Sequence, residues 1–278
     1  MVRIVSDTST LYSTTQAKEA GFAVSPLSVT IAGKSYREFD EISSEDFVAL
    51  IRQGNLPTSS QPAIGEVQAT YEKYAGEEII NIAMADGLSG TYNSAVAAAE
   101  LSEHAEQIMV INSRTLCGPH RYLVQRAVEF AKQGKPVSEI VHWLEEKMDS
   151  AKSYLLPADF EYLRRGGRLS PLVSYVGQVA GLAPVMTQTD DGCRLNVAGV
   201  RRGFAHAVKF VGKALAERGV EKGWRVYISH ADAKQKAQQA LESLKNVLPD
   251  AVYEILPLSP AFITQGGPGC VAIQVIRE

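Results

Sequence analysis

Short apolar runs alternate with longer amphipathic stretches through the first half of the chain. Apolar runs rich in branched residues predict buried strands at residues 3–5, 23–25, 79–85 and 108–111. Apolar residues at helical spacing predict helices at residues 44–53, 64–74, 94–102, 118–133 and 137–149. A hairpin is predicted within residues 27–36, around Ala32-Gly33. Buried strands separated by helices indicate a parallel sheet that helices cover on both faces.

The second half has a different order of elements. Strands are predicted at residues 153–156, 184–189, 194–199, 225–229, 253–256 and 271–276, and helices at residues 160–165, 204–218 and 233–247. The turn sequence Asp190-Asp191-Gly192 joins two of these strands into a hairpin. This half therefore predicts an α+β domain with a mixed sheet. We place the boundary near residue 150, which gives an α/β protein with domains of residues 1–150 and 151–278.

Composition narrows the classes of function. A net charge of −3 over 278 residues argues against a nucleic-acid-binding surface. No apolar run approaches the ~20 residues of a membrane span, and the chain enters its first strand with no signal peptide before it. We therefore expect a cytoplasmic protein.

The cysteines (Cys117, Cys193 and Cys270) form no Cys-x-x-Cys pair and are expected to be buried small residues. The five histidines lack metal-ligand spacing, so we expect no metal and no cofactor.

The segment from Gly87 to Ala95 carries the strongest functional pattern. It follows a predicted strand and leads into a predicted helix, and its glycines and hydroxyls fill the turn between them. Backbone N–H groups at the start of a helix, together with the helix dipole, attract an anion. Ser89, Thr91 and Ser94 are placed to contact such an anion, and no Lys or Arg lies among them. A singly charged anion such as a carboxylate therefore fits this turn better than a phosphate.

Two other interpretations of Ser89 stay open at this point. Ser89 and Thr91 are both typical of residues that cap a helix. Alternatively, Gly87-Leu88-Ser89-Gly90-Thr91 is one residue short of the Gly-x-Ser-x-Gly turn that presents a nucleophilic serine, because Thr91 replaces the second glycine. A hydrolase of that kind needs a histidine base, for which His230 is the candidate.

Three further loops combine glycine or hydroxyl residues. We expect Asp7, in Ser6-Asp7-Thr8-Ser9-Thr10, to be a hydrogen-bonded loop aspartate rather than a nucleophile, because the Asp-x-Asp pattern of aspartyl phosphatases is absent. In the segment 57–62, Ser60 is expected to cap the next helix while Ser59 faces a ligand. The glycine-rich segment 263–270, which contains Gln265, is expected to be a loop that approaches a ligand closely.

Arginines cluster around the pair Gly166-Gly167. Arg164, Arg165 and Arg168 fit a solvated helix end, where cations suit the helix dipole. They equally fit a docking surface for an acidic partner or a phosphate, because the planar guanidinium offers a fork of donors. We expect Arg168 to lie apart from the hydroxyl motifs, since it is distant from all of them in sequence.

Five motifs in a fixed order extend from one end of the chain to the other. They are Ser6-Asp7-Thr8-Ser9, Ser59-Ser60-Gln61-Pro62, the run from Leu88 to Ala95, the run from Tyr162 to Arg168, and Gly267-Pro268-Gly269. Together they resemble the DegV family of bacterial fatty-acid-binding proteins. The resemblance implies that two domains hold one long-chain fatty acid in a tunnel between them. It also implies a partner, a fatty-acid kinase that phosphorylates the bound carboxylate to an acyl phosphate.

The resemblance further implies roles for single residues. The hydroxyls of Ser59 and Ser89 match carboxylate ligands of the family, beside the backbone amides of Gly90 and Thr91. Gln265 stands where the family often has histidine, so this position can donate a hydrogen bond but cannot carry charge.

Arg168 and Arg201 are the candidate residues for docking the kinase. A carrier of this kind needs no catalytic residue. The alternatives are a serine hydrolase that uses Ser89 and a binding protein for another carboxylate.

Overall fold

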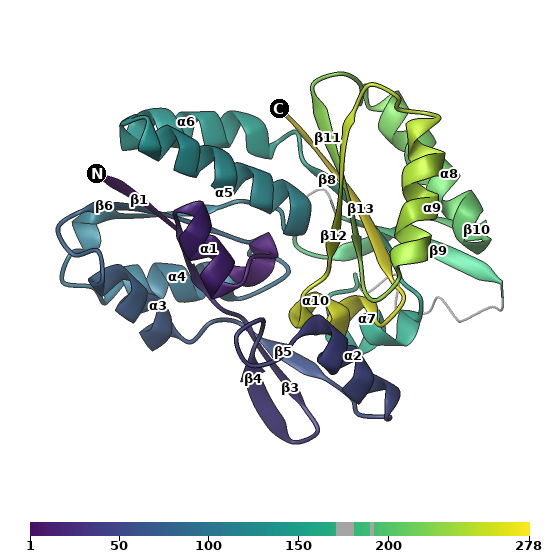
Figure 1. Ribbon diagram of the computed structural model, residues 1–278, viewed down its shortest axis with the longest axis horizontal. Coiled ribbons are helices and arrows are strands. Elements are labelled where there is room, and N and C mark those ends of the chain that lie inside the picture. Colours follow the sequence, from purple (N-terminus) through teal and green to yellow (C-terminus); the bar gives the residue numbers. More distant parts are fainter. Residues whose placement is uncertain (171–180, 190–191) are drawn as a thin grey trace.

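The computed structural model describes residues 1–170, 181–189 and 192–278 (Figure 1). Its strands form a four-stranded sheet in the order β2-β1-β6-β7, a six-stranded sheet in the order β10-β9-β8-β13-β11-β12 and a three-stranded sheet in the order β4-β3-β5. The first sheet is entirely parallel and the second is mixed. The α/β fold class predicted from the sequence is thus confirmed.

The parallel sheet is built from β1 (Val2–Asp7), β2 (Ala23–Ser25), β6 (Glu78–Ala83) and β7 (Ile108–Asn112). Alternate residues of β6 enter different cores, because successive side chains of a strand point to opposite faces. Ile79 and Ala83 pack with α3 (Ile64–Glu72) and α4 (Thr91–Glu100). Ile80 and Ile82 pack with α5 (Cys117–Lys132) and α6 (Val137–Met148). Figure 1 shows these two helix pairs on opposite sides of the sheet, with α1 (Thr14–Ala20) in front.

The mixed sheet consists of β8 (Lys152–Leu156), β9 (Leu182–Gln188), β10 (Leu195–Arg202), β11 (Trp224–His230), β12 (Val252–Pro257) and β13 (Val271–Arg277). Only β11 and β12 pair in parallel. α8 (Gly203–Glu217) and α9 (Lys234–Lys245) close one face with an apolar core. β9 and β10 form the predicted antiparallel hairpin; Asp190 and Asp191 of its turn lie outside the described residues.

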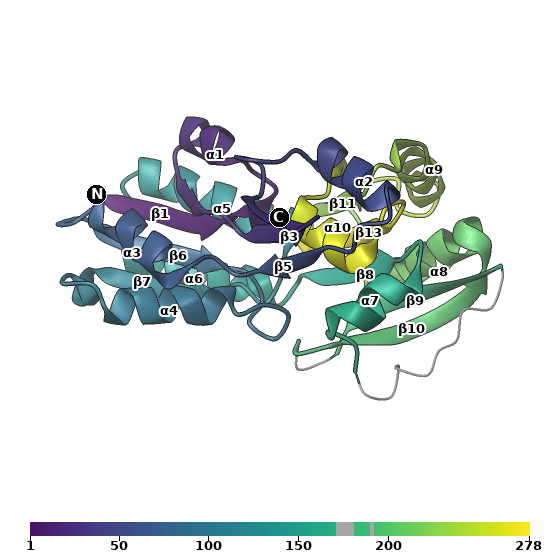
Figure 2. The same ribbon diagram turned by 90° about the horizontal axis from the view of Figure 1, so that it is seen from below.

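A small antiparallel sheet joins the two halves of the molecule. It contains the predicted hairpin, β3 (Ser28–Ile31) with β4 (Lys34–Arg37), and a third strand that was not predicted, β5 (Thr58–Ser60). α2 (Ser44–Arg52) and this sheet pack against α10 (Pro260–Gly266), near the end of the chain (Figure 2). α5 also contacts both β1 and β11, so the largest apolar core continues across residue 150.

Several local predictions need correction. α4 begins at Thr91 rather than Ser94. The segment 263–270 is not an open loop throughout, because its first four residues belong to α10. Ser60 lies in β5 and does not cap α3, whose first flanking residue is Ala63.

Cysteine burial is also only partly as expected: Cys117 and Cys270 are buried, but Cys193 is exposed. Among the described residues, no helix combines the length and apolar character needed to cross a membrane.

Candidate binding site

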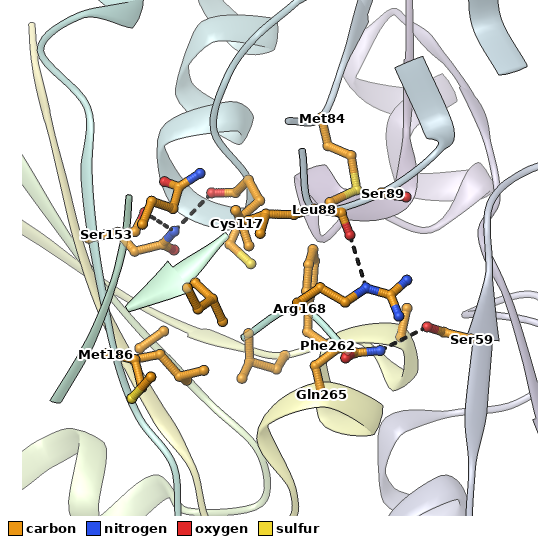
Figure 3. Close-up of a pocket in the computed structure, with 18 of the residues that line it drawn as sticks. Ser59, Met84, Leu88, Ser89, Cys117, Ser153, Arg168, Met186, Phe262 and Gln265 are labelled. Carbon is orange, nitrogen blue, oxygen red and sulfur yellow. Dashed lines mark hydrogen bonds between the residues drawn. The ribbon is translucent and has the colours of Figure 1, made fainter. Parts of the chain in front are cut away.

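A cavity of about 410 Å³ lies where the two larger sheets and the small sheet meet (Figure 3). Its walls come from β5, the loop that follows β6, the start of α5, strands β8 to β10, β13 and α10. The volume falls within the range of about 300–1,000 Å³ that is typical of small-molecule sites. Residues on both sides of position 150 line it, so the site exists only when both halves are folded.

The Gly87–Gly90 loop brings Ser89 to the cavity. This loop connects β6 to the N-terminus of α4, and Gly90 is the residue that precedes the helix. The Ser89 hydroxyl lies 2.8 Å from that of Thr91 and accepts a hydrogen bond of 3.3 Å from the Thr91 amide. Ser89 is half-buried and lines the cavity, whereas Thr91 is buried behind it. The loop thus combines a hydroxyl with the backbone amides of a helix start, as the sequence predicted, although the Thr91 amide already donates to Ser89.

Gln61 locks the loop against the small sheet. Its side-chain amide donates a 2.7 Å hydrogen bond to the hydroxyl of Ser94, in the first turn of α4. A side chain at position 90 would overlap the Gln61 amide, so glycine is needed there for this close approach. Two motifs that are separate in sequence therefore form one wall. Ser94 is already engaged by Gln61, which corrects the expectation that it faces an anion.

Ser59 and Gln265 meet at the same end of the cavity. The Gln265 amide nitrogen donates to the Ser59 hydroxyl at 3.2 Å, across 206 positions of the sequence. The Gln265 amide oxygen is buried and has no hydrogen-bond partner among the described residues. It also lies so close to Gly166 that a side chain there would overlap it. An unpaired buried acceptor is costly. An ionised carboxylate has no proton to donate to this oxygen, so the amide nitrogen is the Gln265 atom that can contact such a ligand.

Arg168 lies between these groups rather than apart from them. Its Nε donates to the Leu88 carbonyl at 3.2 Å, and its Nη1 donates to the Gly166 carbonyl. Within the described ranges it pairs with no carboxylate. Burial, and then the charge of Arg194, lower its guanidinium pKa. The expectation that Arg168 is separate from the hydroxyl motifs is therefore wrong, and a positive charge faces the cavity beside Ser89, as Figure 3 shows.

The rest of the cavity is mainly apolar. In Figure 3, Met186 lies on the same side of the cavity as Ser153, Cys117 lies between Ser153 and Arg168, and Phe262 lies beside Arg168 and Gln265. The polar groups near Ser153 are already engaged with one another. The Gln274 amide donates to the Ser153 hydroxyl at 2.9 Å and to the Leu116 carbonyl at 3.0 Å, and it accepts from Gly118 at 3.3 Å. The site is thus a largely apolar cavity with one cationic, hydroxyl-lined end.

The structure separates the two arginines that were predicted to act together. The Arg168 carbonyl accepts from the Leu195 amide at 2.8 Å, at the start of β10. Arg201 lies six residues farther along that strand, about 20 Å away at the usual rise of ~3.3 Å per residue. Its guanidinium stacks 3.9 Å from the centre of the Phe210 ring. Arg201 is not among the residues that line the cavity, and its docking role stays a prediction.

His230 does not support the hydrolase interpretation. Its Nδ1 accepts a 3.3 Å hydrogen bond from the Ala233 amide, and it does not line the cavity that contains Ser89. None of the residues that line this cavity is a histidine, an aspartate or a glutamate. Ser89 therefore has no general base within the described part of its site.

Asp7 is the hydrogen-bonded loop residue that the sequence predicted. Its carboxylate accepts from the amides of Ser9 at 2.8 Å and Met84 at 3.0 Å, so it fixes the start of the loop that carries Ser89. Among the described residues, no group of three or more His, Cys, Asp or Glu side chains is arranged to hold a metal ion.

Sequence reasoning missed the roles of Gln61, Gly166 and Arg168 in this site. Gln61 belongs to the same motif as Ser59, Ser59-Ser60-Gln61-Pro62, so its presence near the site could have been predicted from the sequence. For Arg168 and Gly166 no local signal exists. Their positions depend on how α7 (Phe160–Gly166) packs against α10.

Curated relatives resemble this chain along its whole length. The model of a family described as "Uncharacterised protein, DegV family" matches residues 1–278. A DegV domain-containing protein of Staphylococcus aureus is 30% identical over 282 residues, which cover 99% of this chain and 98% of the relative. A DegV domain-containing protein of Listeria monocytogenes is 29% identical over 278 residues, which cover 98% of this chain and 97% of the relative.

Solved structures share the fold. DegV of Bacillus subtilis, described as a fatty acid binding protein, superimposes with a TM-score of 0.86 at 25% identity, over 100% of this chain and 99% of that one. A DegV family protein of Eubacterium eligens, loaded with heptadecanoic acid, has a TM-score of 0.84 at 19% identity, over 100% of both chains. From the full-length match to the family model and the relative at 30% identity, this chain belongs to the DegV family.

Proposed function

We propose that this protein binds one long-chain fatty acid in the cavity of Figure 3, with the carboxylate at the end formed by Ser59, Ser89, Gly90, Thr91, Gln265 and Arg168. The observation that carries the proposal is the polarity of the cavity. One end presents hydroxyls, helix-start amides and a guanidinium without a carboxylate partner in the described structure, and apolar side chains dominate the rest. A fatty acid has the same division between head and tail. The relatives that are described as binding or holding fatty acids support this assignment.

Tail burial supplies most of the affinity in this proposal. Each buried methylene contributes roughly 0.8 kcal/mol, so ~14 methylenes contribute about 11 kcal/mol before the costs of association. A hydrogen bond to the charged carboxylate adds about 1.5–3 kcal/mol. The apolar wall therefore sets the strength of binding, while Ser59 and Ser89 set the orientation of the carboxylate.

The head-group residues differ in what each can offer. Ser59 and Ser89 donate through their hydroxyls, the amides of Gly90 and Thr91 donate from the start of α4, and Gln265 donates through its amide nitrogen. Arg168 adds a full positive charge from a half-buried position, where screening by water is reduced. This combination favours an ionised carboxylate over a neutral head group.

We extend the proposal to presentation of the bound acid to a fatty-acid kinase that forms an acyl phosphate. The family resemblance supports this step, and so do two separate sets of exposed arginines, Arg164 and Arg165 on α7 and Arg202 at the end of β10. Arg201 is assigned to docking of the kinase. Arg168 is assigned to both roles, because a residue that contacts the carboxylate also lies beside a phosphoryl group transferred to it. Residues 1–150 and 151–278 then act as two cytoplasmic domains with the ligand between them.

The direct test is to purify the protein, denature it and identify any released lipid by mass spectrometry, followed by calorimetric titration of the lipid-free protein with hexadecanoic acid. We expect a released fatty acid and a stoichiometry of one. A fluorophosphonate probe serves as the control for the hydrolase alternative. Failure to bind any long-chain fatty acid would remove the proposal, and labelling of Ser89 would favour the hydrolase.

A further inference from the structure

Glu38 is a carboxyl group in the interior that makes no contact with the cavity. Its side chain is 0% exposed, in the turn that follows β4. One carboxyl oxygen accepts from the Thr8 hydroxyl, and the other accepts from the Ala261 amide at 2.9 Å. The Thr8 hydroxyl in turn accepts from the Leu27 amide at 3.0 Å. A single carboxyl group therefore ties the end of β1 and the start of β3 to α10.

The far end of this linkage is a wall of the cavity. Ala261 lies in the first turn of α10, and the same short helix carries Phe262 and Gln265, which face the cavity (Figure 3). Leu27, at the other end of the linkage, also lines the cavity. Displacing the start of α10 would therefore move the Gln265 amide away from Ser59.

No cation compensates the burial of Glu38 within the described structure. The charged group that acts on it within the described structure is the carboxylate of Asp7, which is negative. Burial is the main reason that the Glu38 pKa is raised to about 7. Burying an acid in such surroundings costs free energy, and the hydrogen bonds that its two oxygens accept offset part of this cost. Glutamine at this position would fill the same space and still accept one hydrogen bond.

We propose that Glu38 is a positioning residue that holds α10 against the small sheet, so that Phe262 and Gln265 keep their places in the cavity wall. The part that concerns the ligand rests on the proposed binding of a fatty acid. The part that concerns α10 does not, because it can be measured without any ligand.

The test compares Glu38→Gln with Glu38→Met. Both substitutes are close in size to glutamate, but only glutamine can still accept the hydrogen bond from Ala261. Hydrogen exchange is followed in the full-length, ligand-free protein, with α3 and α4 on the far side of the first sheet as internal references. We expect α10 amides to exchange about tenfold faster in Glu38→Met and within about twofold of wild type in Glu38→Gln, because losing one buried acceptor costs on the order of a factor of ten.

Binding of hexadecanoic acid is then measured for the same proteins. We expect Glu38→Met to bind about tenfold more weakly, with Glu38→Gln restoring most of the affinity. If Glu38→Met does not fold, Thr8→Val removes the other hydrogen bond of the carboxyl group and should speed α10 exchange about threefold.

Unchanged α10 exchange in both Glu38 variants would overturn the proposal. Equal acceleration in α3, α4 and α10 would overturn it as well, because it would indicate global destabilisation. A third outcome is faster α10 exchange in Glu38→Met combined with failure of the wild-type protein to bind the acid. This outcome would support the role of Glu38 in holding α10 and would refute only the proposed function.

Discussion

Two groups of polar side chains lie near the loop between β6 and α4, but they differ in their exposure to solvent and in their hydrogen-bond partners. The cavity cluster consists of Ser59, Ser89, Arg168 and Gln265. The inner cluster consists of Asp7, Thr8, Ser9, Glu38 and His120. Every member of the inner cluster is at most 2% exposed, and each has a hydrogen-bond partner within the protein. Every member of the cavity cluster is half-buried and lines the cavity.

Among the described residues, neither cluster combines an accessible serine with a histidine base. In the inner cluster, Ser9 lies 2.6 Å from His120 Nδ1, the contact that a serine nucleophile needs. Burial lowers the His120 pKa and favours the neutral imidazole, but no substrate can reach Ser9. In the cavity cluster, Ser89 is accessible, but none of the described residues that line its cavity is a histidine. Within the described part of the chain, the serine with a base is therefore buried, and the accessible serine has no base in its cavity. We infer that the inner cluster positions the loops and the cavity cluster recognises the ligand.

The largest expected effect comes from breaking the inner cluster at His120. His120→Ala removes the hydrogen-bond partner of Ser9 and one of the two partners of Ser6, which still donates to the Ile82 carbonyl, and it opens a cavity in the core. We expect the free energy of unfolding to fall by about 3–5 kcal/mol, as for other disrupted buried networks. Urea denaturation measures this effect. A loss below about 1 kcal/mol would mean that this cluster does not stabilise the fold.

Glu38 makes the free energy of unfolding depend on pH, and the direction of its pKa shift gives the sign of this dependence. Its folded pKa of about 7 is raised from 4.5, so the stability that it contributes is fully present below pH 4.5 and is lost as the pH rises through about 7. We expect the unfolding free energy of wild type, minus that of Glu38→Gln, to fall by about 3 kcal/mol over this range. Denaturation at several pH values measures the difference, from which other titrating groups largely cancel. A difference that does not change with pH would contradict the assignment.

Ser89 and Ser9 provide a matched pair across the two clusters. Ser89→Ala removes a donor to the carboxylate, so we expect fatty-acid affinity to weaken by about 1.5–3 kcal/mol. Ser9→Ala should leave affinity unchanged and lower stability instead. Calorimetry and denaturation on both variants separate the effects. Equal affinity in wild type and Ser89→Ala would exclude Ser89 from the carboxylate site.

Arg168 and Arg201 separate binding from docking. Because Arg168 faces the cavity, we expect Arg168→Ala to weaken fatty-acid binding by about 1–2 kcal/mol, whereas Arg201→Ala should leave it unchanged. Both variants should reduce acyl-phosphate formation with a fatty-acid kinase. Normal phosphorylation of Arg201→Ala would mean that Arg201, a half-buried strand residue, has no docking role.

The smallest expected effect concerns Gln265, which cannot titrate. Gln265→His introduces a group that ionises between about pH 5 and 8, so affinity for the acid should become stronger as the pH falls through this range. The wild-type profile should be flatter. Identical profiles for the two proteins would mean that position 265 does not face the carboxylate.

Much of the fold was predictable because its signals are local. The apolar runs at 3–5, 79–85 and 108–111 correspond to β1, β6 and β7. β1 and β6 are central strands that are buried on both faces, whereas β7 is an edge strand that is only partly buried. The glycine pair at 166–167 ends α7, with Gly167 in the left-handed region at φ 70°. The segment 263–266 was mispredicted because Gly266, Gly267 and Gly269 suggested a loop and obscured the end of a short helix that packs against α2, α7 and β5.

The sequence by itself determined most strands and helices in their order, with α1, β5 and α10 as exceptions, together with the helix-start loop with Ser89 and the presence of Ser59 and Gln265 among polar loop motifs. Each depends on residues that are neighbours along the chain. Only the tertiary structure decided that Gln265 meets Ser59, that Arg168 faces the cavity beside Leu88, and that Glu38 holds α10. These contacts join residues 206, 80 and 223 positions apart. No local pattern encodes such pairs, because they form only when the packing of two sheets brings distant loops together.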